Sequence, residues 1–222
     1  TLCMTSEALT ASIGWSTKGD AAQVGAEAAG RALATLRRSP HLAVVFGSSW
    51  FDQTQLLDGV HTVLGDTPLI GGSTAGEITP DGPVTHSCVV LLISADTCGW
   101  SVGVGEEIDR APREAGQQAA LAATRQFHGS PRTAFLLIGD GLVTNFADVI
   151  RGMQEVLGTS FLIAGGMAAD DLRFSRTYQY ANHRALTRSV GGVLLGGAGR
   201  LGVGIEHGFS PMIDSPFDRR AI

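Results

Sequence analysis

The sequence lacks the features of several common protein classes. It has no cluster of lysine and arginine, and 16 basic residues face 21 acidic ones. Binding to a nucleic-acid backbone needs a basic stripe, so we expect no nucleic-acid partner. The longest uncharged apolar run, Val190 to Ala198, is too short to cross a bilayer. No basic stretch followed by an apolar one opens the chain, so we expect no signal peptide and no membrane insertion.

Cysteine is also scarce, and no pattern of metal ligands is present. Cys3, Cys88 and Cys98 form no CxxC pair, and the six histidines show no HExxH or CxxCH spacing. Cys88 lies within an apolar run, where a free cysteine usually behaves as a small buried hydrophobe. We therefore expect a cytoplasmic protein without a metal ion or cofactor.

Glycine and small apolar residues are plentiful. The chain has 222 residues, 30 of them glycine, with 44% hydrophobic and 17% charged residues, which indicates a compact globular domain. The stretch from Leu56 can be laid on the stretch from Val149; before it, 43–49 pairs with 135–141, and after it, 101–107 resembles 201–207. This similarity predicts an internal duplication with halves at about 13–108 and 109–214, in a single domain over 1–222.

Hydrophobic periodicity predicts similar elements in both halves. Each half is expected to contain a helix, a strand, a second helix closed by glycine, a short strand, and two strands that form a hairpin. The predicted fold is mixed α/β, a pseudo-symmetric duplication of a helix-strand-helix-strand-strand-strand unit with mixed sheets flanked by helices. The expected helices are 20–38, 52–64, 112–127 and 145–157; the expected strands are 42–46, 68–71, 88–95, 100–107, 134–138, 160–164, 190–196 and 201–207.

The segment GGSTAGE at 71–77 follows one of these strands. It resembles a nucleophile elbow, but the register gives G-x-S-x-A, and the prolines in ITPDGP prevent a helix from starting there. A structural turn at Ser73 is therefore favoured over a catalytic serine. A cradle of backbone N–H groups for an anion stays open. The second half has AGGMAAD at 164–170 in the corresponding place, so the two hydroxyl groups are particular to the first half.

GGSTAGE, the preceding VVFGSSWFD, the STKGD before the first helix and the late GIEHGFSPMID together resemble FIST domains, from about Ile13 to about Asp214. The resemblance implies a sensory domain of bacterial signal transduction that binds a small ligand, with amino acids as the proposed class. It also implies a C-terminal FIST region or a signalling output protein as a partner. At Gly72 the family often has cysteine, so thiol chemistry at that position is absent here.

We expect the ligand between the two halves, because polar loops at strand ends form binding sites in sheets with crossover helices. Asp140, Asp170 and Asp171 follow strands of the second half, although an aspartate there often bonds only to neighbouring backbone. Trp50 could be a core anchor or an apolar wall. The predicted ligand-binding residues are Ser48, Ser49, Trp50, Gly72, Ser73, Thr74, Glu77, Asp140, Asn145 and Asp170.

Two alternatives from other functional classes remain. One, which the resemblance to FIST domains implies, is a haem-containing nitric oxide sensor, in which His207 or His183 would be the axial ligand. The other is a hydrolase that uses Ser73, which would need a histidine and an acid close to that hydroxyl group. We expect a domain without catalytic residues.

Overall fold

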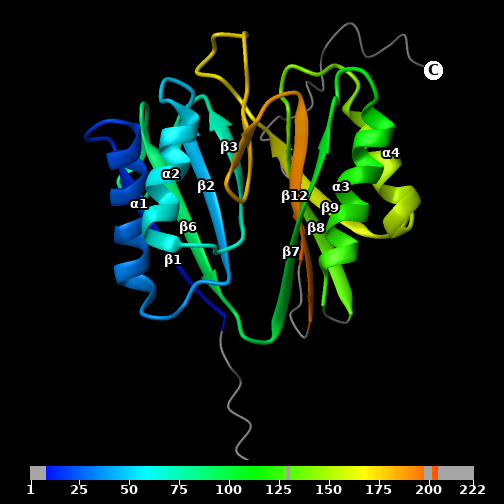
Figure 1. The fold of residues 1–222 in the computed structure, drawn as a ribbon, viewed down its shortest axis with the longest axis horizontal. Helices are drawn as coiled ribbons and strands as arrows, with labels where there is room; N and C mark the ends of the chain where they lie inside the picture. The colour runs from blue at the N-terminus through cyan, green and yellow to red at the C-terminus, as the bar shows by residue number, and fades with distance from the viewer. Residues whose placement is uncertain (1–8, 129–130, 198–201, 205–222) are drawn as a thin grey trace, which may run out of the picture.

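Two β-sheets pack face to face between two pairs of helices (Figure 1). The computed structural model describes residues 9–128, 131–197 and 202–204. Helices α1 and α2 cover one sheet, and α3 and α4 cover the other, so the layers run helix, sheet, sheet, helix (Figure 1). No helix in these ranges is long and apolar enough to span a bilayer. The mixed α/β fold predicted from the sequence is confirmed.

The first sheet has six strands in the order β1-β6-β2-β3-β10-β11. The neighbours β2 and β3 are parallel and are joined through α2, whereas all other neighbours are antiparallel. Its strands and helices are β1 (Thr10–Ser16), α1 (Ala21–Leu36), β2 (Leu42–Ser48), α2 (Gln53–Leu64), β3 (Leu69–Thr74), β6 (Cys88–Ser94), β10 (Gln179–Ala181) and β11 (Arg184–Leu186).

The second sheet has four strands in the order β7-β12-β8-β9, with β8 and β9 parallel and the other neighbours antiparallel. A separate hairpin is formed by β4 (Glu77–Thr79) and β5 (Gly82–Val84). The elements of the second sheet are β7 (Cys98–Glu106), α3 (Pro112–Gln126), β8 (Arg132–Gly139), α4 (Phe146–Leu157), β9 (Leu162–Met167) and β12 (Ser189–Gly197).

The strand order of the second sheet repeats part of the first. The sets β1-β6-β2-β3 and β7-β12-β8-β9 have the same order along the chain and the same strand directions. In each set a helix joins the first strand to the second, and another helix joins the second strand to the third. The internal duplication inferred from the sequence stays a prediction.

The predicted hairpin of 88–95 with 100–107 is wrong. β6 pairs with β1 and β2 in the first sheet, whereas β7 pairs with β12 in the second. The short connection between Ser94 and Cys98 resembles a hairpin turn in the sequence, but it carries the chain from one sheet to the other. The other predicted hairpin joins 190–196 to 201–207; residues 201 and 205–207 lie outside the described residues.

The helix boundaries follow from local sequence. Asp20 caps α1 in a reciprocal capping box, and Asp52 caps α2 through a bond from a backbone N–H. Pro112 is the first residue of α3, where its missing N–H costs nothing. Gly65 and Gly158 end α2 and α4 with positive φ angles of 58° and 103°. These caps account for the close agreement between predicted and observed helices.

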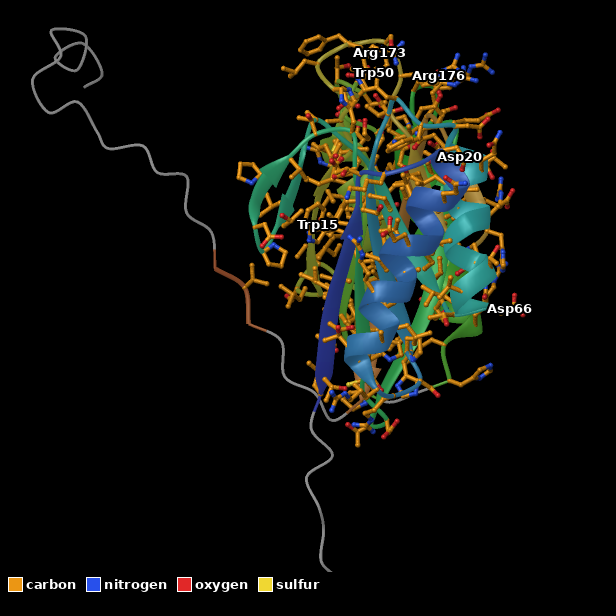
Figure 2. All side chains as sticks on the ribbon, turned by 90° about the vertical axis from the view of Figure 1, so that its left-hand side faces the viewer. Trp15, Asp20, Trp50, Asp66, Arg173 and Arg176 are labelled. Atoms are coloured by element: carbon orange, nitrogen blue, oxygen red, sulfur yellow. The ribbon has the colours of Figure 1, made fainter. Side chains whose placement is uncertain are left out.

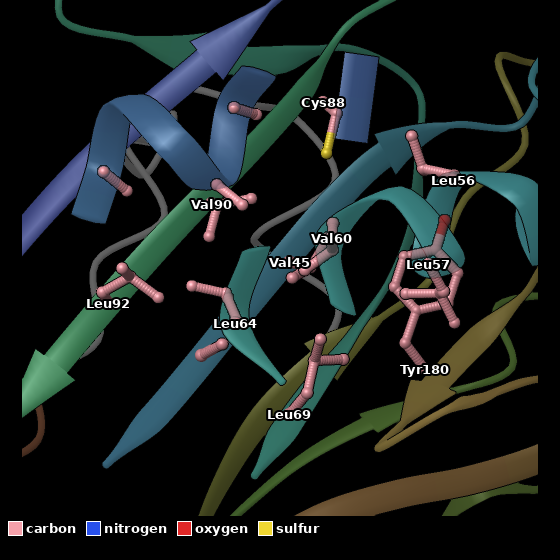
Figure 3. Packing of buried hydrophobic residues seen from close by; sticks show 14 of the residues in the cluster. Val45, Leu56, Leu57, Val60, Leu64, Leu69, Cys88, Val90, Leu92 and Tyr180 are labelled. Carbon is pink, nitrogen blue, oxygen red and sulfur yellow. The ribbon is translucent and has the colours of Figure 1, made fainter. Parts of the chain in front are cut away.

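Three apolar layers hold the fold together. The first lies between α1, α2 and the first sheet, where Leu56, Leu57 and Tyr180 are buried (Figure 3). A second lies between α3, α4 and the second sheet, and a third between the two sheets. Cys88 belongs to the first layer, and burial raises the pKa of its thiol group well above the usual range. It is a small core residue, as the sequence indicated.

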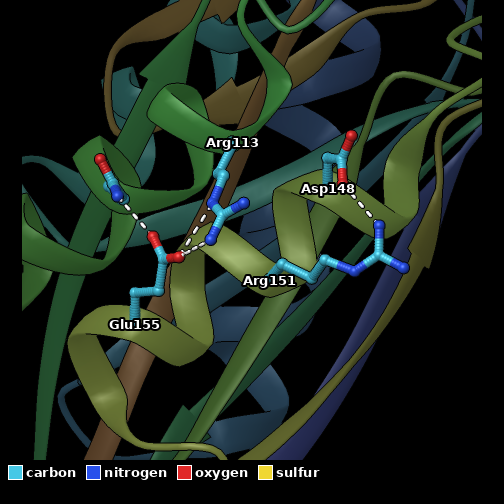
Figure 4. A network of polar contacts seen from close by, with 5 residues as sticks. Arg113, Asp148, Arg151 and Glu155 are labelled. Carbon is cyan, nitrogen blue, oxygen red and sulfur yellow. Dashed lines mark hydrogen bonds and ion pairs between the residues drawn. The ribbon is translucent and has the colours of Figure 1, made fainter.

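The outer surface of α3 and α4 carries ion pairs (Figure 4). Arg113 of α3 binds Glu155 of α4 through Nε at 2.8 Å, and Arg151 binds Asp148 at 2.6 Å. The two arginine side chains are more than half exposed, and the two carboxylates are about one third exposed. Exposed ion pairs contribute only about 0–1 kcal/mol, so the apolar layers dominate the stability.

Candidate functional site

The polar strand ends predicted from the sequence meet at one end of the molecule, the top in Figure 1. The parallel pairs β2–β3 and β8–β9 direct their carboxyl ends there. Residues 168–178, which we call the connecting segment, lead from β9 in the second sheet to β10 in the first. The segment therefore links the strand ends of both sheets.

The connecting segment is fastened to the first sheet by a carboxylate. Asp171 Oδ2 accepts hydrogen bonds from Ser48 Oγ at 3.0 Å, from Ser49 N at 2.7 Å and from Ser49 Oγ at 2.7 Å. Asp171 adopts a positive φ of 54°, which is uncommon for a residue with a side chain. The two serines predicted to bind ligand are thus bound to Asp171 instead.

Ser73 serves the same attachment. Its hydroxyl group donates to the carbonyl oxygen of Ala169 at 2.6 Å and accepts from the backbone N–H of Tyr178 at 2.8 Å. The side chain is 1% exposed, so both its hydrogen-bonding roles are used inside the protein. No histidine bonds to Ser73 in the described part of the chain, and a hydrolase built on this residue lacks its general base there.

Glu77 is a buried carboxyl group next to these strand ends. It is 2% exposed and accepts hydrogen bonds from the hydroxyl groups of Thr74 and Ser87. Burial raises the pKa of Glu77 above its usual range; the two hydroxyl groups oppose this rise and the charge of Asp171 adds to it. Thr74 and Glu77, both predicted ligand contacts, therefore form a hydrogen bond with each other.

The variant Glu77→Gln is expected to gain stability relative to the native protein as the pH rises. An unfolded glutamate loses its proton near pH 4.3, whereas folded Glu77 keeps its proton to a higher pH. The native protein therefore loses stability between these two pKa values, and a neutral glutamine does not. Urea unfolding at pH 4 and pH 8 measures the difference, with Glu107→Gln at an exposed side chain as the control. An equal difference at both pH values would contradict this prediction.

Asp140 and Asp170 hold backbone at the ends of β8 and β9. Asp140 accepts from the N–H groups of Leu142 and Arg188 and from the hydroxyl group of Thr177 at 2.8–3.0 Å. Asp170 accepts from the N–H groups of residues 174, 175 and 176 at 2.6–3.0 Å. Burial opposes ionisation of Asp170, but these backbone bonds together keep its pKa below the usual range. Each residue is 4% exposed.

The remaining predicted residues are placed differently. Gly72 lies between the sheets, where a Cβ atom would be 2.8 Å from the carbonyl oxygen of Tyr178; a side chain would require its neighbours to shift. Trp50 is 60% exposed, and the guanidinium group of Arg173 lies 4.7 Å from its ring centre. Asn145 is exposed and bonds only to Asp148 in the described structure.

Histidine ligation finds little support in the described residues. His183 lies in the turn between β10 and β11, stacks on His61 at 3.7 Å between ring centres, and bonds to Asp66 at 3.0 Å. No cluster of histidine, cysteine or carboxylate side chains in the described ranges could hold a metal ion. His207, the other proposed haem ligand, lies outside the described residues.

A cavity of about 630 Å³ lies beside the connecting segment and was not predicted from the sequence. It brings together Asp109, Asp140, Arg176 and Arg188. A second, smaller hollow of about 270 Å³ along the segment is lined by Ser49, Arg173, Arg176 and Tyr178, among others. Figure 2 shows Trp50, Arg173 and Arg176 together at this end of the molecule. Only Asp140 and Ser49 among these lining residues belong to the predicted site.

Comparison with known proteins gives three findings. No curated protein matches the chain. Among solved structures, cyanuric acid hydrolase from A. caulinodans is similar, with a TM-score of 0.44 and 10% identity over 87% of this chain and 72% of that chain. The model of the FIST N domain matches residues 41–217. Because this match covers most of the sequence, the chain belongs to the FIST N domain family, a family of sensory domains in signal transduction.

Proposed function

We propose that this domain senses a small amino-acid-like molecule, without catalysis, in the cavity beside the connecting segment. The observation that carries the proposal is the cavity itself, because the loops after β7 and β8, the connecting segment and the residues before β12 converge on it. Its volume of about 630 Å³ lies within the range typical of small-molecule sites, roughly 300–1,000 Å³.

The charges around the cavity suit a molecule with a carboxylate and an ammonium group. Arg176 and Arg188 supply guanidinium groups, which bind carboxylates through paired hydrogen bonds. Asp109 supplies a carboxylate, and it lies 3.6 Å from Arg188 in a loose, largely exposed pair. A ligand ammonium group would compete for Asp109. Asp140 holds the residues of the cavity wall in place rather than contacting the ligand, because its carboxylate oxygens already accept three hydrogen bonds from the protein.

The connecting segment offers a route from the ligand to the rest of the domain. Thr177 bonds to Asp140 of the second sheet, while Asp171 bonds to Ser49 of the first. A ligand that contacts Arg176 would therefore act on a segment attached to both sheets. Such a ligand transmits a signal only if it binds two arrangements of the segment with different affinity.

A thermal-shift screen tests the proposal. A ligand at 100 times its dissociation constant stabilises the folded state by about 2.7 kcal/mol, and each kcal/mol raises Tm by about 2–4 °C in a domain of this size. We expect at least one free amino acid to raise Tm by about 5–10 °C, and its carboxyl-amidated analogue to have a much smaller effect. No shift with any amino acid at millimolar concentration would contradict the proposal.

A further inference from the structure

Two hairpins in the chain have the same build. β4–β5 and β10–β11 pair in the same register, with Glu77 opposite Val84 in one and Gln179 opposite Leu186 in the other. A serine follows each hairpin at the same distance and donates its hydroxyl to the first residue of the hairpin: Ser87 to Glu77, and Ser189 to Gln179.

The residue before each of these serines confirms the equivalence. His86 and Arg188 both adopt a positive φ, of 52° and 50°. The serine carbonyl oxygens also accept in the same way, from the N–H of Ser48 at the end of β2 and from the N–H of Asp140 directly after β8. The two hairpins are therefore equivalent in position within their halves.

Only one of these hairpins has joined a sheet. β10 adds to the edge of β3 in the first sheet, with Tyr180 opposite Gly71. The joint is closed by backbone bonds from Ser73 N to Tyr178 O at 2.9 Å and from Asn182 N to Leu69 O at 2.8 Å. Tyr180 is fully buried in the apolar layer to which Leu57 of α2 also belongs (Figure 3).

The corresponding joint of the other half is open in the described residues. β4–β5 forms a sheet of its own, and β9, which corresponds to β3, ends its sheet with no strand on its outer side among residues 9–128, 131–197 and 202–204. Ile78, which corresponds to Tyr180, is 83% exposed, and Met167 at the end of β9 is 42% exposed. Free strand edges of this kind pair with further strands.

An apolar hollow lies beside β9, in the position that corresponds to the one the Tyr180 side chain occupies beside β3. It measures about 500 Å³ and is lined by Phe146 and Ile150 of α4 and by Ile163 and Met167 of β9, with Val203 among its other lining residues. Ile150 holds the place in α4 that Leu57 holds in α2 under the alignment of the two halves. The hollow is thus the counterpart of the space that Tyr180 fills in the first half.

We propose that β9 accepts the β4–β5 hairpin of a second copy of this chain. The contacts of the two strands fix the register. Gly71 pairs with Val45, and a Cβ atom on it would lie 1.8 Å from the Val45 carbonyl oxygen; Gly165 pairs with Leu137, and a Cβ atom on it would lie 2.0 Å from the Leu137 carbonyl oxygen. By these contacts Gly165 takes the place of Gly71, one residue further along than the sequence alignment puts it. Ile78 of one copy then lies opposite Gly165 of the other and enters the apolar hollow. We assign a second copy as the occupant because each chain carries both the free hairpin and the free strand edge. The pairing of β10 with β3 is the template for how the hairpin would pair with β9. Such a head-to-tail contact forms a closed ring or a longer assembly, depending on the rotation between copies.

The oligomeric state in solution tests this proposal. We expect light scattering after size exclusion to give at least twice the chain mass of 23.1 kDa, with the mass rising with concentration. Ile78→Asp and the edge variant Met167→Pro should each reduce the apparent mass toward that of one chain. Ile78 is exposed, and the N–H of Met167 points away from β8 because that of the next residue, Ala168, bonds to Gly139, so circular dichroism should show an unchanged fold. Leu172→Asp, at a side chain that is 74% exposed, is the matched control and should assemble like the native protein.

An equimolar mixture of the two variants separates this joint from other contacts. Ile78→Asp retains a native β9 edge, and Met167→Pro retains a native hairpin, so the mixture should recover part of the assembly. A native protein that stays at the mass of one chain at all soluble concentrations would overturn the proposal, and it would then leave a different polypeptide as the occupant of the edge. Assembly of Ile78→Asp equal to that of the native protein would also overturn it.

Discussion

Gly25→Ala is expected to lower the free energy of unfolding by about 3 kcal/mol, whereas Gly30→Ala in the same helix is expected to raise it by about 0.5–1 kcal/mol. A Cβ atom at Gly25 would lie 2.2 Å from the carbonyl oxygen of Leu56 in α2, while nothing lies within 4 Å of one at Gly30. The first change forces α1 and α2 apart, and the second only removes glycine's cost in a helix.

Urea unfolding measures the free energy of unfolding of the two variants. The comparison is direct because both changes are glycine to alanine and both lie in α1. Gly116 of α3 repeats the contact, since a Cβ atom there would lie 2.1 Å from the carbonyl oxygen of Val149 in α4. Gly116→Ala should therefore behave like Gly25→Ala. Equal stability of Gly25→Ala and Gly30→Ala would contradict the close approach of the helices.

Asp170→Ala is expected to lower the free energy of unfolding by about 3 kcal/mol at neutral pH. The change removes the acceptor of three backbone N–H groups at residues 174–176, and each hydrogen bond to a charged group contributes about 1.5–3 kcal/mol before partial compensation by water. The connecting segment would lose the turn at 174–176, which helps to line the cavity of about 630 Å³ and the hollow of about 270 Å³.

The effect of Asp170→Ala should also depend on pH. The folded pKa of Asp170 is lowered, so its contribution is complete above the unfolded value near 3.9 and disappears as the pH falls through the folded value. Chemical unfolding at pH 7 and pH 3 measures the change. Asp58→Ala on the exposed surface of α2 is the control, with an expected effect within about 0.5 kcal/mol. A loss no larger than that of the control at pH 7 would contradict the role of Asp170.

The helices and the central strands could be predicted because their signals are local. Asp20, Pro112 and the glycines after α2 and α4 mark helix ends in the sequence. Sheet membership could not be predicted in the same way, since pairing joins distant residues: β6 and β7 are adjacent in the chain but belong to different sheets. The short strands β4, β5, β10 and β11 have too few residues for a periodic signal.

The candidate site shows a second limit. The sequence identified polar residues at strand ends; Ser48, Ser49 and Ser73 do bond to the connecting segment, and Asp170 is part of it. Their partners are other protein groups, which composition cannot reveal. Arg176 and Arg188 could not be predicted as lining residues of the cavity, because loops that form a cavity have no periodic sequence pattern. Extending the alignment of the halves to 77–87 and 179–189 could have revealed the equivalent hairpins.

Calorimetric titration of the native domain and of Arg176→Ala with the amino acid selected by the thermal-shift screen tests the central claim most directly. Arg125→Ala, at an exposed arginine in the last turn of α3, is the control. Loss of a charge-assisted hydrogen bond costs about 1.5–3 kcal/mol, so Arg176→Ala should bind about 10–100 times more weakly while Arg125→Ala binds like the native domain. Equal affinity of Arg176→Ala and the native domain would contradict binding beside the connecting segment.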